Sequence, residues 1–232
     1  MSTEWQSFGG GDRWRYLQDG RLVFEQGLKH VADDAKAHFV LDKDGAIRTR
    51  GTPQTAAQLR ADHGALIVAA ARRFKLSPAL IASVLLCESG RVEGSFSRDP
   101  ISIRREPGYI SDEATPGKIS AGLMQTLLRT ARAMCVETGW SPSSPIDGRP
   151  RELVRQDLYI PANSIFLGAA YLRYEAGQNK TEDLLLLHGA YNCGNVYYAE
   201  ALDLNIKAYG ADHRFAKAAG YYNDWLAAGG ER

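Results

Sequence analysis

Glu88 is the residue in this sequence whose type and position best suit acid–base chemistry. It lies near the end of the stretch 77–90, which begins with a serine and a proline and closes with a glycine, residues typical of helix ends. Within it Ile81, Val84 and Leu85 recur at helical spacing, so Glu88 continues an apolar stripe. Poor solvation and the negative end of the helix dipole are both expected to raise the pKa of its carboxyl group. Such a group suits a general acid, whereas a glutamate that simply ends a helix in water is the plain alternative.

Two further motifs follow the Glu88-Ser89 pair, namely Gly-Leu-Met-Gln at 122–125 and Ala-Tyr-Asn at 190–192. In this order and spacing, the three motifs resemble those of the soluble lytic transglycosylases, glycoside hydrolase family 23, which are lysozyme-like enzymes that cleave peptidoglycan. The resemblance covers roughly residues 52–225. Arg-Glu-Pro-Gly-Tyr at 105–109 also resembles an insertion found in part of that family, many of whose members are phage-encoded.

The resemblance implies a mechanism that needs a single carboxylate. No second acid lies within the three motifs, although most glycosidases use a pair of carboxyl groups. In lytic transglycosylases the 6-hydroxyl group of N-acetylmuramic acid attacks its own anomeric carbon, which closes a 1,6-anhydro ring and releases the chain without water. The same glutamate, here Glu88, first donates a proton to the glycosidic oxygen and then accepts one from that hydroxyl group.

The resemblance also implies a set of substrate-binding residues around Glu88. The amide of Gln125 is expected to line the cleft, Met124 to give it an apolar floor, and Ser89 to brace the loop after the helix. Tyr191 and Asn192 would bond the acetamido group of the substrate or orient Glu88. One late tyrosine is also expected near the substrate; it is Tyr221 or Tyr222, and Tyr222 is included in the predicted site. Tyr109 is the last residue expected there. The segment 91–119 is long and rich in prolines, serines and charges, so it is interpreted as one wall of the cleft. That wall would also carry Arg104 and Arg105.

Two other functions remain open at this point. A hydrolytic muramidase similar to goose-type lysozyme would use an acid of the long loop to position water, with Asp99, Asp112 and Glu113 available. The alternative from another class is a non-catalytic wall-binding or structural component of a phage particle or secretion apparatus. Turnover of purified sacculi separates this alternative from both enzymes.

Composition adds few constraints beyond those of a globular protein. The 232 residues carry a formal net charge of +1 with no basic block, so neither nucleic acid nor an anionic membrane surface is expected as a partner. The three cysteines show no paired or metal-ligand spacing, so reduced thiols, no metal and no cofactor are expected. The first residues lack a basic start and an apolar run, which argues against a signal peptide. The expectation is a monomer made in the cytoplasm that reaches glycan strands of peptidoglycan by holin-type release, virion delivery or specialised secretion, without membrane insertion.

The pattern along the chain favours a mainly α-helical protein. Residues 1–50 form an expected appendage with a hairpin at 39–47, and residues 51–232 form the expected lysozyme-like catalytic domain. In the appendage, Trp5, Trp14 and Tyr16 are expected to cover a neighbouring core more readily than to stack on sugar rings. Helical periodicity and caps predict helices over 55–74, 78–89, 123–138, 151–158, 161–176, 182–193 and 212–228, with Thr181 as the cap of the sixth.

Overall fold

The protein is mainly α-helical, as the sequence pattern predicts, with small antiparallel sheets. The computed structural model describes residues 3–7, 13–25, 27, 29, 38–89, 101–194, 196 and 212–232. The strands are β1 (Gln6–Ser7), β2 (Arg13–Tyr16), β3 (Leu22–Phe24), β4 (Phe39–Leu41), β5 (Ile47–Thr49), β6 (Ile103–Arg105), β7 (Ile119–Ala121) and β8 (Thr126–Leu127). The helices are α2 (Gln54–Phe74), α3 (Pro78–Ser89), α4 (Leu128–Thr138), α5 (Pro161–Gln178), α6 (Leu184–Cys193) and α7 (Asp212–Ala227), with 3-10 turns η1 (Pro116–Lys118) and η2 (Arg155–Tyr159).

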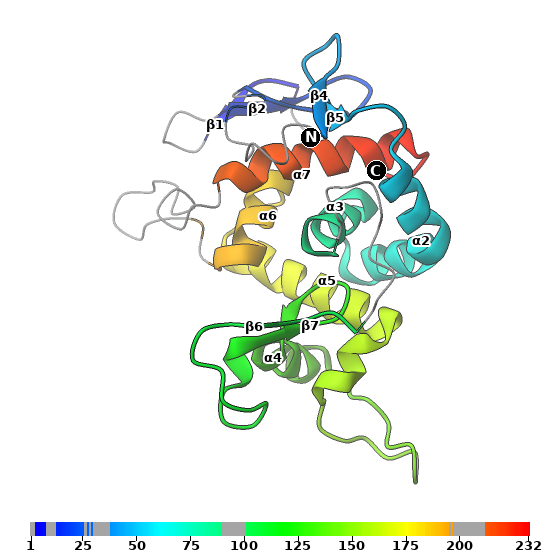
Figure 1. Ribbon diagram of the computed structural model, residues 1–232, viewed down its shortest axis with the longest axis vertical. Helices are drawn as coiled ribbons and strands as arrows, with labels where there is room; N and C mark the ends of the chain where they lie inside the picture. The colour runs from blue at the N-terminus through cyan, green and yellow to red at the C-terminus, as the bar shows by residue number, and fades with distance from the viewer. Residues whose placement is uncertain are drawn as a thin grey trace.

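Helix α3 is the centre of the fold. It is surrounded by α2, α5, α6 and α7 (Figure 1). Every residue from Pro78 to Leu86 is buried, and Ser77 begins the helix by accepting a hydrogen bond from the Leu80 backbone N–H at 3.3 Å. The predicted apolar stripe was therefore too narrow, because a helix that is apolar all round packs on all its sides. Only the last turn, with Glu88, is half-exposed.

The N-terminal strands lie against α7. The sheets β1-β2-β3 and β4-β5 cover one side of that helix, at the top of Figure 1. Trp14 and Tyr16 are 0% and 2% exposed and belong to the same buried cluster as Phe215 and Tyr222 of α7. These two aromatic side chains therefore pack in the core, as predicted, whereas Trp5 remains 38% exposed. The division of the chain at residue 50 is still a prediction. Buried side chains from before and after residue 50 belong to the same cluster.

Helix α5 joins two buried clusters of side chains. Ile165, Ala169 and Leu172 face the large cluster around α3, while Leu167 and Ala170 face a smaller one. The smaller cluster lies under the sheet β6-β7-β8 and helix α4, at the bottom of Figure 1. Because one helix contributes a face to each cluster, it holds the sheet at a fixed position relative to the end of α3.

Helix boundaries were predicted well for the long helices and poorly around the motifs. The segment 101–119 was expected as an irregular loop but contains β6 and η1 and leads into β7, while 90–100, with the predicted glycine end of α3 and Asp99, lies outside the described residues. The helix predicted from residue 123 begins only at Leu128, because 122–125 form a turn between β7 and β8. The short helix predicted over 151–158 is the 3-10 turn η2, and α6 is capped by Asp183 rather than Thr181.

Among the described residues, no helix combines the length and apolarity needed to span a bilayer.

Candidate active site

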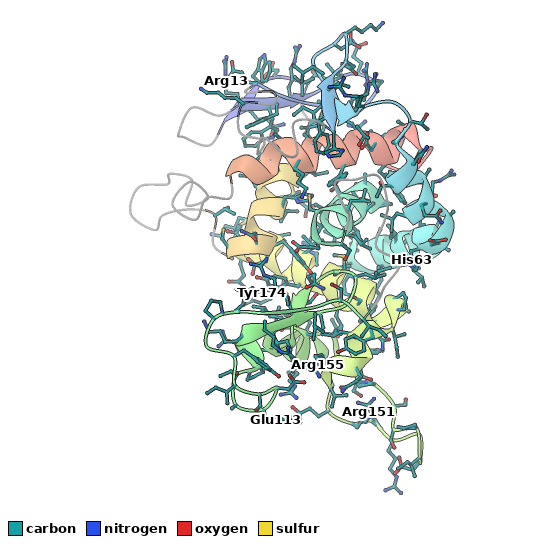
Figure 2. The ribbon with its side chains drawn as sticks, in the orientation of Figure 1. Arg13, His63, Glu113, Arg151, Arg155 and Tyr174 are labelled. Carbon is teal, nitrogen blue, oxygen red and sulfur yellow. The ribbon has the colours of Figure 1, made fainter. Side chains whose placement is uncertain are left out.

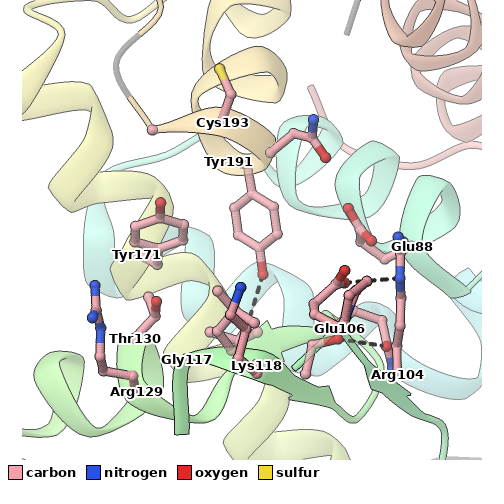
Figure 3. Close-up of a pocket in the computed structure, with 17 residues that line it drawn as sticks. Glu88, Arg104, Glu106, Gly117, Lys118, Arg129, Thr130, Tyr171, Tyr191 and Cys193 are labelled. Carbon is pink, nitrogen blue, oxygen red and sulfur yellow. Dashed lines mark hydrogen bonds and ion pairs between the residues drawn. The ribbon is translucent and has the colours of Figure 1, made fainter. Parts of the chain in front are cut away.

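The cavity at the end of α3 holds parts of all three motifs. Its volume is about 800 Å³, and Glu88, Gln125, Tyr191 and Asn192 line it. It is bounded by the last turns of α3 and α6 and by the sheet β6-β7-β8 with the start of α4. Figure 3 shows Glu88 on the same side as Arg104 and Glu106. The structure thus brings four residues of the predicted site to one cavity, namely Glu88, Gln125, Tyr191 and Asn192.

The end of α3 is tied to the Gly-Leu-Met-Gln turn. The Ser89 hydroxyl group donates a hydrogen bond to the Leu123 carbonyl oxygen. Ser89 itself is not among the residues that line the cavity, and its hydrogen bond fixes the helix end next to Glu88. The loop after the helix, which it was expected to brace, lies outside the described residues. This bond couples the position of Glu88 to that of the turn across the cavity.

The turn can form only with glycine at its first position. Gly122 has a φ of +75°, and a Cβ atom there would lie 1.9 Å from the Leu158 carbonyl oxygen. The backbone N–H of Met124 then donates to the hydroxyl group of Ser164 on α5 at 3.0 Å. Met124 is fully buried against Gly168, so it lies beneath the cavity and does not line it. Met124 was predicted to give the cleft an apolar floor, and it supports the cavity from below by packing.

Gln125 faces the cavity with its amide already engaged. Its Nε2 group donates to the carbonyl oxygens of Gly122 and Ser102 at 2.8 and 3.1 Å, and its Oε1 atom accepts from the Ser120 hydroxyl group at 3.1 Å. Both amide hydrogens are thus used within the protein. Gln125 also has a φ of 47°, so its side chain stabilises an unusual backbone conformation. In this arrangement Gln125 shapes the cleft wall. Toward a substrate it can only accept a further hydrogen bond at Oε1.

Tyr191 connects α6 to the same turn. Its hydroxyl group donates to the Met124 carbonyl oxygen at 2.8 Å, so its contact with Thr126 Oγ1 at 3.0 Å places Thr126 as the donor. Burial raises the pKa of Tyr191, which keeps the phenol protonated. Asn192, the next residue, is exposed and lines the cavity. Tyr191 therefore holds the wall in place, while Asn192 is the residue of the pair that can reach a substrate.

One face of the β6–β7 ribbon lines the cavity with charged side chains. In the antiparallel register Arg104 is opposite Ser120, and the Glu106 backbone N–H donates to the Lys118 carbonyl oxygen at 2.8 Å. Since side chains alternate along strands, residues 104, 106, 118 and 120 share a face, and all four line the cavity. The ion pair between Arg104 and Glu106 spans 3.0 Å and is drawn in Figure 3.

Sequence reasoning missed Glu106 and Lys118 as cavity residues because it did not recognise the strands. The signal was present in the Arg-x-Glu spacing at 104–106, which places both side chains on one face once the segment is extended. Arg129, Thr130, Tyr171 and Cys193 were also missed, and they line the cavity as well. Burial raises the pKa of Cys193 to about 11, so its thiol stays protonated near neutral pH.

The predicted tyrosines Tyr109 and Tyr222 lie outside the cavity. Tyr109 donates a hydrogen bond to Asp112 at 2.7 Å and lies under the Arg105 guanidinium group, 5.3 Å from the ring centroid. Tyr222 is buried in α7 and donates to the Gly20 carbonyl oxygen at 3.1 Å, toward the N-terminal sheet. Tyr221 is also buried on α7 and packs edge-on against Phe39. None of these three rings lines the described cavity. Each is held instead by the contacts just given.

Two of the acids suggested for a hydrolytic mechanism, Asp112 and Glu113, are among the described residues, and neither lines the cavity. Asp112 accepts from Arg155 at 3.0 Å as well as from Tyr109, and the two contacts hold it in the lower part of the molecule. Glu113 is exposed, in the lower part of the molecule in Figure 2. Asp99 lies outside the described residues. Within the described part of the chain, Glu106 is the carboxyl group that shares the cavity with Glu88. Among the described residues, no group of three or more histidine, cysteine or acidic side chains is placed to hold a metal ion.

Together the fold and the cavity define a lysozyme-like helical domain with a glutamate at the end of its central helix. The sequence matches the Transglycosylase SLT domain over residues 65–209, more than half of the chain, and the protein belongs to that family. No curated protein sequence matches the chain significantly. Membership supports an activity of the lytic transglycosylase type on peptidoglycan.

Proposed function

We propose that the protein cleaves the β-1,4 bond between N-acetylmuramic acid and N-acetylglucosamine and forms a 1,6-anhydro ring, with Glu88 as the single general acid and base. The observation that carries this proposal is the cavity itself. It combines Glu88, at the end of a buried helix, with Gln125, Tyr191 and Asn192 from the other two motifs.

In this mechanism, the Glu88 carboxyl group protonates the glycosidic oxygen as positive charge builds on the anomeric carbon. The resulting carboxylate then accepts the proton of the muramic acid 6-hydroxyl group, whose oxygen bonds to the anomeric carbon. The bond to the leaving sugar breaks, the 1,6-anhydro bond forms, and Glu88 returns to its protonated state. No water is consumed, so one carboxyl group is sufficient.

The test is the mass of the soluble muropeptides released from purified sacculi. Ring closure gives products about 18 Da lighter than those of hydrolysis, because hydrolysis adds one water. Anhydromuropeptides as the main product support the proposal. Hydrated products would replace it with the muramidase, and an absence of any turnover would favour the non-catalytic alternative.

The muramidase remains the second candidate because Glu106 lines the cavity with Glu88. A hydrolase needs a base that activates the attacking water. Glu106 lines the cavity, whereas Asp112 does not. Glu106 is also engaged in the ion pair with Arg104, which a base acting on water would have to leave.

Ring closure predicts that Glu106→Gln lowers the rate of wall cleavage by less than about tenfold, since no water has to be activated. Asp112→Asn, outside the cavity, is the matched control and is expected to act only through the packing of Tyr109 and Arg155. Initial rates on sacculi measure both variants. A loss of about a thousandfold in folded Glu106→Gln, with Asp112→Asn close to the parent, would support hydrolysis instead.

A further inference from the structure

The cavity continues past the motifs into a basic region. A second cavity of about 430 Å³ adjoins the first and shares five lining residues with it, including Lys118 and Arg129. Figure 3 shows Arg129 with Thr130 and Tyr171 on the side of the cavity opposite Glu88 and Arg104, and Lys118 between the two sides. A substrate that extends from Glu88 across the cavity therefore passes two cations.

These two cations differ from four other basic residues in the same part of the molecule. Arg104, Arg132, Arg151 and Arg155 each form an ion pair with an acid in the same part of the molecule. Among the described residues, by contrast, neither Lys118 nor Arg129 forms an ion pair or a side-chain hydrogen bond. Their charges are thus directed at solvent in the cavity and not neutralised by the protein.

The position of Arg129 does not serve the stability of its own helix. It is the second residue of α4, and the first turn of α4 has no acidic residue. A cation at the positive end of a helix is unfavourable for that helix. A role in binding accounts for a charge that helix stability does not favour.

We propose that Lys118 and Arg129 bind carboxylate groups carried by the muramic acid residues of the strand, a role that rests on the proposed function. The sugar rings of peptidoglycan are uncharged, so its anions are the carboxylates of the peptide stems, or the free lactyl carboxylate where a stem has been removed. Both cations suit this chemistry, because an ammonium group and a guanidinium fork both form charge-assisted hydrogen bonds with carboxylates. The pair thus selects strands with acidic substituents over neutral sugar polymers.

The test measures binding by protein that carries Glu88→Gln, so that strands stay intact. Lys118→Gln and Arg129→Gln are added singly and together, and Arg73→Gln, an exposed cation at the end of α2 outside both cavities, is the matched control. The ligands are soluble glycan strands with peptide stems, the same strands after an amidase has removed the stems, and N-acetylglucosamine oligomers, which lack any carboxylate. Dissociation constants are measured at low and at high salt.

We expect the double variant to bind stem-bearing strands about tenfold more weakly at low salt, with a smaller difference at high salt because exposed charges are screened. Binding of the N-acetylglucosamine oligomers should not change, and Arg73→Gln should match the parent on every ligand. A loss confined to stem-bearing strands identifies the stem carboxylates as the groups bound. The same loss on stripped strands shows that the two cations also bind the lactyl carboxylate that stem removal frees.

Unchanged binding of both anionic ligands by the double variant would overturn the inference, as would an equal loss on the neutral oligomers. The outcome is independent of catalysis. If the parent enzyme fails to cleave sacculi, the proposed function fails while the binding comparison still decides the role of the two cations.

Discussion

Replacing Glu88 by glutamine is expected to lower the rate of peptidoglycan cleavage by about 10⁴-fold or more. General acid–base catalysis contributes roughly 10² to 10⁴ in rate, and here one residue is proposed to fill both roles. The amide has nearly the shape of the carboxyl group, and the end of α3 is held by Ser89 and by the buried residues before it. The variant should therefore fold and bind glycan strands normally. Initial rates on sacculi, together with strand-binding affinity, measure the two parts of this prediction.

Glu113→Gln is the matched control for Glu88→Gln, because Glu113 is an exposed acid outside the cavity. It should cleave sacculi at close to the parent rate. Substantial lysis by purified, folded Glu88→Gln protein would exclude both the assignment of Glu88 and the single-carboxylate mechanism. Loss of binding as well as of rate would instead show that Glu88 contributes to holding the strand.

The sequence predicted the parts of the fold that depend on local pattern. Helix α2 was predicted at 55–74 and spans Gln54–Phe74, and α7 was predicted at 212–228 and spans Asp212–Ala227, since both show helical periodicity. The position of Glu88 followed from the helix signals before it. These features are encoded within a few turns of chain, so no knowledge of the partner elements was needed.

The cavity wall opposite Glu88 could not be predicted in the same way. Strands β6 and β7 are three residues each, too short to show a clear alternation, and their pairing depends on contacts distant in the chain. Residues 123–125 were assigned to a helix, because the left-handed conformation of Gly122 that forms the turn is required by Leu158 and Ser164, which come much later in the sequence. Glu106 and Lys118 were missed for the same reason: the register that aligns them is a tertiary property.

The role of residues 1–50 is the second feature where a large effect is expected. Trp14, Leu22, Phe24 and Ile47 are at most 1% exposed and pack in the cluster that contains α7. Burying an apolar side chain contributes about 1.5–3 kcal/mol, so these four alone contribute roughly 6–12 kcal/mol. Total stabilities of domains are only about 5–15 kcal/mol. A protein that begins at residue 51 is therefore expected to lose its folded state, measured as loss of soluble protein with a cooperative thermal transition.

Asn223 permits a subtler test in the full-length chain. Its side chain accepts from the Leu22 backbone N–H at 2.8 Å and donates to the carbonyl oxygens of Leu22 and Ile47 at 2.9 and 2.8 Å, which links both N-terminal sheets to α7. Asn223→Ala leaves these buried backbone groups unsatisfied, so we expect the free energy of unfolding to fall by about 3 kcal/mol or more. Asn163→Ala, which loses one hydrogen bond at a less buried site, should cost about 1 kcal/mol. A folded, active protein beginning at residue 51, together with an Asn223→Ala variant as stable as the parent, would show that the segment is the separable appendage predicted from the sequence.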